Sequence, residues 1–137
     1  MLQLGAAGTF ARHRYEFSRA VDGGETIVDG NDVDTAPRQL HNFWLRWQPV
    51  SSVSTEAEWL VVGKYFVDAA NEHDYPGHEL LNLRARWDVT PGWSLSARLM
   101  NALDRAYADR ADFAFGNYRY FPGRGRAVFV EVGWTAK

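Results

Sequence analysis

Hydrophobic and polar residues alternate along most of the chain with a period of two residues, which is typical of β-strands whose two faces meet different surroundings. The alternation is clearest over residues 80–88 and again over 93–100. Thr90-Pro91-Gly92 separates these two runs, and in this turn proline presets φ while glycine permits a positive φ. The stretch therefore predicts an antiparallel hairpin.

The same alternation predicts four further strands, over residues 2–17, 38–47, 53–65 and 124–134. No segment shows a convincing helical period. Each of the six strands lies next in sequence to its expected partner. The predicted fold class is therefore all-β, an antiparallel meander.

The connections between these strands differ in length in a regular way. Those at 48–52 and 89–92 are short, whereas those at about 18–37, 68–77 and 104–123 are long. Because short and long connections alternate, all short turns are expected at one end of the sheet and all long loops at the other. Outer-membrane β-barrels show this asymmetry.

Large aromatic residues stand at the two ends of the apolar face. Trp47, Trp87, Trp93 and Trp134 lie at its short-turn end, and Tyr65 lies at the opposite end. Trp and Tyr prefer the membrane–water interface, where the ring is partly dehydrated and its polar atom stays wet. These residues therefore predict membrane-interface girdles with a lipid-facing surface between them. The alternative is that they form the core of a soluble β-sandwich or lipocalin-like ligand-binding barrel.

The opposite face carries charges of both signs that can pair across neighbouring strands, namely Arg46, Glu56, Glu58, Lys64, Arg84, Arg86, Arg98 and Glu131. An Arg or Lys in contact with lipid at the bilayer midplane would cost about 2–4 kcal/mol, so this face is expected to line a lumen. Arg12, Arg14 and Glu16 share the parity of the apolar face, and we expect them to stand in water beyond Phe10.

Composition limits the possible classes of protein. The chain has 137 residues, enough for one domain, and its net charge of −2 gives no basic field for nucleic acid. Cysteine is absent, which excludes disulfides and thiolate chemistry. No apolar run is long enough for a transmembrane helix. The mean hydropathy of −0.38 is compatible with a membrane barrel, because alternating residues average out as hydrophilic.

Candidate ligand-binding residues lie in the last long loop, namely Arg110, Phe113, Phe115, Tyr118, Arg119 and Tyr120. Such rings and cations suit an anionic, aromatic metal chelate through stacking and cation–π contacts. The alternative is that this loop packs only on itself.

The loop at 71–78 contains Glu72, His73, Asp74 and His78, which are residue types that bind metals. Their spacing matches no zinc or iron template, and a hydrophilic loop explains them equally well, so no metal site is predicted. No nucleophile, base and acid occur at a catalytic spacing. We therefore expect neither an enzyme nor a bound cofactor.

Three stretches carry more specific motifs. The first stretch is the segment 30–40. The second contains Asn101, Leu103, Asp104 and Tyr107, and the third contains Pro122, Gly123, Arg124 and Trp134. The second resembles the Asn-Leu-x-Asp-x-x-Tyr element of the penultimate strand of TonB-dependent outer-membrane receptors, and the third resembles their Pro-Gly-Arg and aromatic ending. The first resembles the family's entry from a loop into a strand. In this order, the motifs resemble the C-terminal β-barrel portion of such a receptor.

The resemblance implies a barrel of about 22 strands in the bacterial outer membrane, closed by a plug, that imports a scarce ligand, most commonly a ferric siderophore. It implies as partners outer-membrane lipid, the rest of the barrel and plug, the TonB energy-coupling complex reached through an N-terminal part, and a metal chelate as cargo. Nucleic acid is not among the expected partners.

Six strands correspond only to the C-terminal part of such a barrel, so residues 1–137 are expected to be a fragment without plug domain or signal peptide. Thr135, Ala136 and Lys137 follow Trp134, whereas the family ends on its aromatic residue, which puts efficient assembly in doubt. The alternative of a small structural outer-membrane barrel is weakened because the smallest common ones have about eight strands.

Overall fold

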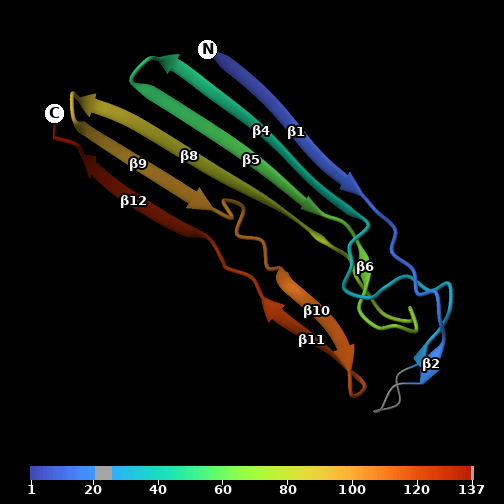
Figure 1. Ribbon diagram of the computed structural model, residues 1–137. Helices are drawn as coiled ribbons and strands as arrows, with labels where there is room; N and C mark the ends of the chain where they lie inside the picture. The colour runs from blue at the N-terminus through green and yellow to red at the C-terminus, as the bar shows by residue number, and fades with distance from the viewer. Residues whose placement is uncertain (21–25, 137) are drawn as a thin grey trace.

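The structure is a computed structural model that describes residues 1–20 and 26–136 (Figure 1). These residues form strands, turns and irregular segments without a helix, which confirms the predicted all-β class. Within the same residues, no helix is long and apolar enough to cross a membrane. Residues 21–25 of the first long loop, and Lys137 at the end, lie outside the described residues.

Six long strands form one antiparallel sheet, in which each strand pairs with its neighbour in the sheet order (Figure 1). They are β1 (Leu2–Phe10), β4 (Gln39–Val50), β5 (Val53–Val62), β8 (His78–Thr90), β9 (Trp93–Met100) and β12 (Ala127–Trp134). The predicted meander is confirmed. The sheet does not close on itself, and β1 and β12 are its two edges.

Connections of different length lie at opposite ends of this sheet, as the sequence predicts. The short turns β4–β5 and β8–β9 lie at the same end as both termini, and the long connections lie at the other (Figure 1). Gly92 has a φ of 90°, which confirms the predicted turn chemistry.

Each long connection contains a small hairpin that the sequence pattern did not reveal. These are β2 (Arg19–Ala20) with β3 (Thr26–Ile27), β6 (Tyr65–Phe66) with β7 (Asp74–Tyr75), and β10 (Ala108–Ala114) with β11 (Asn117–Pro122).

The first strand ends at Phe10 and not at Phe17, which corrects the prediction from alternation. Its register with β4 ends where Phe10 pairs with Gln39, and an isolated bridge then joins Arg14 to Asp32. Arg14 lies four residues after Phe10, whereas Asp32 lies seven residues before Gln39. Because the two segments differ in length, regular strand pairing cannot continue between these points. The guanidinium groups of Arg12 and Arg38 both bind Asp32 beyond that point, so these charges lie outside the sheet.

The strand registers give the sheet one apolar and one polar face, because residues directly opposite each other share a face. Leu45 opposes Ala57, Ala57 opposes Leu83, and Leu83 opposes Leu99, which makes an uninterrupted apolar row. On β12 the side chains of Val128, Val130 and Val132 continue the apolar face and are 65–67% exposed.

The four tryptophans lie on this apolar face at the short-turn end, as predicted. Trp47 is paired with Leu2, and Trp93 is paired with Trp134, with ring centroids 6.4 Å apart. All four rings are about half exposed, at 49–64%. A soluble core would bury such rings, so the apolar face of the described sheet is unlike a soluble core.

Opposite charges pair across strands on the polar face. Glu56 accepts hydrogen bonds from Arg46 at 2.7 Å and from Arg84 at 2.6 Å, and Arg84 also donates to Glu58 at 2.8 Å. The amide of Asn42 donates to Glu58 at 3.0 Å. This confirms the expected cross-strand pairing for the central charges.

Two other charges expected in this network pair elsewhere. Lys64 contacts Asp74 in a loop, and Arg86 contacts Asp88 on its own strand.

A buried hydrophobic cluster lies among the long connections and not on the sheet. It consists of Tyr65, Val67, Tyr75, Ala108 and Ala111. Tyr65 is only 8% exposed, so its predicted place in a second interface girdle is wrong. The reason is that β5 ends at Val62, and the chain turns Tyr65 into the loop cluster instead of continuing the apolar face.

A charge placed on either face of β12 tests whether the apolar face contacts lipid. We expect Val130→Arg to destabilise the folded sheet by about 2–4 kcal/mol, because Val130 lies on the apolar face near the middle of β12 along its length. The neighbouring Glu131→Arg introduces the same side chain on the polar face and is expected to cost much less. Urea unfolding in lipid vesicles measures both values, and equal costs would show that the apolar face is not in lipid.

Candidate functional site

The three long connections pack against one another into a single layer beyond the sheet. Asn71 and Asp32 exchange two hydrogen bonds, one between the Asp32 N–H and Asn71 Oδ1 at 2.7 Å and one from Asn71 Nδ2 to the Asp32 carbonyl at 2.9 Å. On the other side, the Phe113 N–H donates to the Val67 carbonyl at 2.8 Å. The second connection therefore joins the first to the third.

Two tyrosine hydroxyls attach the β10–β11 hairpin to this layer. The Ala111 N–H donates to Tyr65 Oη and the Ala108 N–H donates to Tyr75 Oη, each at 3.1 Å. Burial is the main cause that raises the pKa of Tyr65, so its hydroxyl stays protonated at neutral pH. The buried N–H groups of Ala108 and Ala111 in β10 are thus satisfied by tyrosine side chains.

The β10–β11 hairpin has two chemically different sides, which are set by its register. Phe113 pairs with Tyr118, and Ala111 pairs with Tyr120, on what we call the aromatic side. The alternate pairs make up what we call the charged side, and these are Arg110 with Phe121 and Asp112 with Arg119. The structure therefore brings together the six predicted ligand residues in one hairpin but divides them between two sides.

Rings on the aromatic side stack on each other and on the neighbouring connection. Phe113 stacks on the imidazole of His73, with centroids 3.6 Å apart and planes 10° apart. Tyr118 and Tyr120 stack in parallel at 5.9 Å, and Tyr120 lies 6.4 Å from Tyr75. The self-packing alternative is therefore correct for this side of the loop.

On the charged side, two guanidinium groups flank one buried carboxylate. Arg119 Nε donates to Asp112 Oδ1 at 2.5 Å, and Arg110 Nη2 lies 3.1 Å from Asp112 Oδ2. Each cation also lies near a ring, since Arg110 is 5.4 Å from the centroid of Phe121 and Arg119 is 6.0 Å from that of Phe115. Asp112 was not among the predicted site residues. Its position in the sequence between two predicted residues, Arg110 and Arg119, was a usable signal.

A pocket of about 660 Å³ lies where this hairpin meets the polar face of the sheet. Its lining includes Leu40, Val62 and His78 from the sheet and Asp109 and Arg110 from the hairpin. Leu40 opposes Val62, and Val62 opposes His78, so the three share the face that carries the Arg84 network. The pocket is therefore at the loop end of the polar face.

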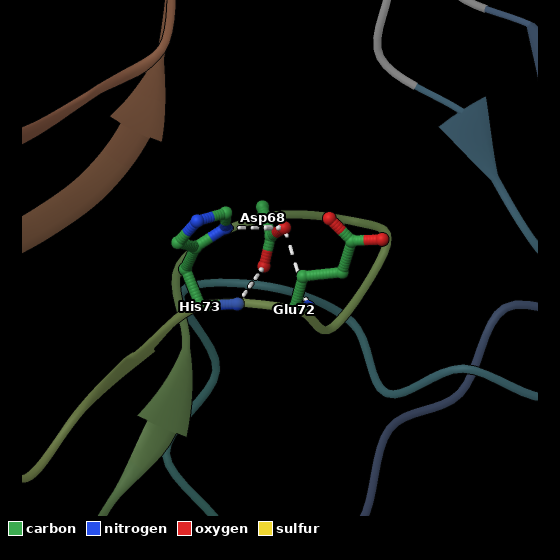
Figure 2. Close-up of side chains that lie close together, drawn as sticks. All are labelled: Asp68, Glu72 and His73. Atoms are coloured by element: carbon green, nitrogen blue, oxygen red, sulfur yellow. Dashed lines mark hydrogen bonds and ion pairs between the residues drawn. The ribbon is translucent and has the colours of Figure 1, made fainter.

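The residues of the loop at 71–78 that could bind a metal are separated by the structure. Asp74 pairs with Lys64, and His78 Nδ1 lies 3.0 Å from the hydroxyl of Tyr75. Glu72 and His73 instead lie beside Asp68 (Figure 2).

The side chain of Asp68 stabilises this turn by hydrogen bonds. Its carboxylate accepts hydrogen bonds from the backbone N–H groups of Glu72 and His73, and it contacts the imidazole of His73 at 3.1 Å (Figure 2). These bonds within the turn bring the three side chains together and stabilise its conformation.

The Asn101–Tyr107 motif fastens the last loop to the end of the sheet. Asn101 is buried with a positive φ of 48°, and its side chain donates to the carbonyls of Arg105 and Arg124 at 2.9 and 3.2 Å. Its own N–H donates to Asn82 on the polar face at 3.0 Å. Asp104 accepts from the Arg126 N–H at 3.0 Å, so both ends of the 104–123 loop are held together.

Gly123 completes this junction because the ring of Tyr107 lies directly against it. A Cβ at position 123 would lie 2.1 Å from Tyr107 Cζ, which no side chain can tolerate without movement. The Gly123 N–H donates to the Tyr107 carbonyl at 2.9 Å. Burial first, and the nearby Asp109 carboxylate second, raise the pKa of Tyr107, which keeps its hydroxyl protonated.

Comparison with known proteins places this architecture in one family. A family model described as "TonB dependent receptor-like, beta-barrel" matches residues 2–102. No curated protein matches the chain in sequence.

Several solved structures match the fold. The siderophore receptor PiuA from Acinetobacter baumannii has a TM-score of 0.78 at 18% identity, over 97% of this chain and 19% of the receptor. The ferric yersiniabactin uptake receptor FyuA from Yersinia pestis gives 0.77 at 17% identity, over 97% and 21%. The ferric-catecholate import receptor Fiu from E. coli K12 gives 0.71 at 16% identity, over 96% and 18%. The chain thus spans about a fifth of the length of these structures.

Substitution of the two glycines after Pro122 tests the junction. We expect Gly123→Ala to displace the Tyr107 ring and destabilise the loop by about 1–3 kcal/mol, measured as faster proteolytic cleavage within 104–123. Gly125→Ala is the matched control, because its Cβ would lie 3.8 Å from the nearest atom. In a Tyr107→Ala background, Gly123→Ala should add little. An equal effect there would contradict the proposed clash.

Proposed function

The chain belongs to the TonB-dependent receptor-like β-barrel family, and from this premise we propose that it forms the C-terminal part of the barrel wall of an outer-membrane import receptor. Proteins of this family are transporters and not enzymes. The observation that carries the proposal is the single open sheet with one apolar face, one charge-paired face and all long connections at one end.

The apolar face supports a position in the outer membrane. Its exposed valines and leucines suit hydrocarbon, and the four half-exposed tryptophans suit the interface at the short-turn end. The edge strands β1 and β12 cannot stay unpaired in lipid. Each backbone N–H or C=O group without a hydrogen-bond partner costs roughly several kcal/mol in the hydrocarbon region. Further strands of the same barrel are the proposed partners of these two edges.

The proposed cargo is a ferric siderophore. Two observations support it, since the similar solved structures include receptors named for siderophores, and the β10–β11 hairpin presents arginines and rings beside a pocket. A plug that closes the lumen against the polar face, and the TonB energy-coupling complex, are the partners that this function requires.

Membrane fractionation and iron uptake test the proposal in cells that carry the gene in its natural setting. We expect the protein in the outer-membrane fraction, released by detergent but not by alkaline carbonate. Recovery in the soluble fraction would support a lipocalin-like barrel instead.

Iron uptake tests the cargo. Under iron limitation, cells should accumulate iron from an Fe(III)–catecholate complex and lose most of this uptake when residues 108–121 are replaced by a short Gly-Ser turn. Disruption of the whole gene sets the baseline. Unchanged uptake at a normal membrane level of the loop variant would exclude this loop from transport.

A further inference from the structure

The two sides of the β10–β11 hairpin are not equally available for contact with a ligand. Phe113 on the aromatic side is already stacked face to face on His73, and Tyr118 and Tyr120 are stacked on each other. A ligand that used these rings would have to replace contacts that the loop makes with itself. Within residues 1–20 and 26–136, the rings of the charged side stack on no neighbouring connection, and this side adjoins the pocket on the polar face through Arg110.

The arginines of the charged side keep most of their hydrogen-bonding capacity. Arg119 donates its Nε–H to Asp112, and neither terminal amino group of its guanidinium donates a hydrogen bond to the described part of the chain. Arg110 contacts Asp112 through one terminal nitrogen, and this contact lacks hydrogen-bond geometry, since Asp112 Oδ2 accepts no hydrogen bond from the described residues. The side chains of Arg110 and Arg119 are 63% and 47% exposed. Both cations are therefore held in place yet open to solvent.

The charge of this group is not balanced. Two guanidinium groups share the single carboxylate of Asp112, whose side chain is 9% exposed. Asp109 lines the pocket next to Arg110, and its carboxylate interacts with the hydroxyl of Tyr107. Arg110, Arg119 and Asp112 together carry a net charge of +1, and this charge favours an anion at the exposed guanidinium groups.

Exposed rings stand at both ends of this cationic pair. Phe121 is 48% exposed next to Arg110, and Phe115 is 87% exposed near Arg119. Phe115 and Gly116 are the two central residues of the turn between Ala114 and Asn117, and their φ angles of 54° and 75° are those of a tight hairpin turn. The ring of Phe115 therefore stands at the tip of the hairpin, near Arg119, where a ligand can reach it.

We propose that the charged side of the β10–β11 hairpin is the cargo-binding surface, where Asp112 positions Arg110 and Arg119 as a clamp for an anionic group of an aromatic ligand. Phe115 and Phe121 supply stacking surfaces on either side of the clamp. Phe113, Tyr118 and Tyr120 hold the hairpin in place and do not touch the cargo. The inference rests on the proposed import function and narrows it to ligands that carry negative charge beside a ring.

Binding measurements on the protein extracted from outer membranes in detergent test this assignment. The probes are an anionic Fe(III)–catecholate complex, anionic but non-aromatic Fe(III)–citrate, and an uncharged Fe(III)–trihydroxamate complex, each followed by quenching of Trp fluorescence. We expect the catecholate complex to bind most tightly. Arg110→Gln and Arg119→Gln should each weaken its binding roughly tenfold, as expected for loss of a charged hydrogen bond.

The preference for anionic over uncharged probes separates a clamp from a folding defect. Loss of the clamp lowers this preference, whereas a distorted loop weakens all probes alike. Asp112→Asn should lower the preference in the same way, because Arg119 loses its anchor. Tyr120→Leu on the aromatic side should leave the preference for anionic probes unchanged, because Tyr120 supports the hairpin and does not touch the cargo. Arg126→Gln, which removes a cation paired with Asp104 outside the hairpin, should leave binding within about twofold.

Three results would overturn the assignment, and they are distinguishable. Weaker binding in Tyr120→Leu with unchanged binding in the arginine variants would move the cargo to the aromatic side. Equal weakening of all probes in the arginine and Asp112 variants would show a structural role only. If the unaltered protein binds none of the iron complexes, the iron-chelate function itself fails, and the clamp fails with it.

Discussion

One sheet whose two faces need different solvents is the constraint on which the rest of this structure depends. The apolar face leaves rings and branched side chains uncovered, while the polar face pairs Arg46, Glu56, Arg84 and Glu58 across three strands. Neither water nor hydrocarbon alone satisfies both faces, whereas the proposed position of the sheet, as a wall between a membrane and a lumen, satisfies both. The same argument applies to its edges, which require partner strands because lipid offers no hydrogen bonds.

The buried hydrophobic cluster of the described residues lies where the chain leaves this wall. The cluster around Val67 and Ala111 gives the long connections a small core, and side-chain bonds such as those of Asn71 join neighbouring connections. This layer has a consequence for binding. A hairpin that is fixed on one side by stacking against His73 can present the other side with little loss of conformational entropy when a ligand binds.

The junction at Asn101 explains why a short motif can mark the end of a barrel strand. Its side chain and backbone connect the polar face, the start of the loop and the return into β12, so one residue closes a loop of more than twenty residues. The family match ends at residue 102, whereas the structural likeness extends over 97% of the chain, which includes this loop and β12. The loop therefore keeps the family's geometry beyond the region that the family model matches.

The sequence by itself determined the strands, their order, the two faces and the level of the four tryptophans. These features follow from a two-residue period and from turns such as Thr90-Pro91-Gly92, which act between near neighbours. Only the tertiary structure decided the burial of Tyr65, the hairpins within the loops, and the division of the predicted ligand residues between two sides with Asp112 at the centre of one. Loop segments have no period to follow, and the direction of side chains such as Tyr75 and Tyr65 is set by partners 33 and 46 residues away, in their bonds to Ala108 and Ala111.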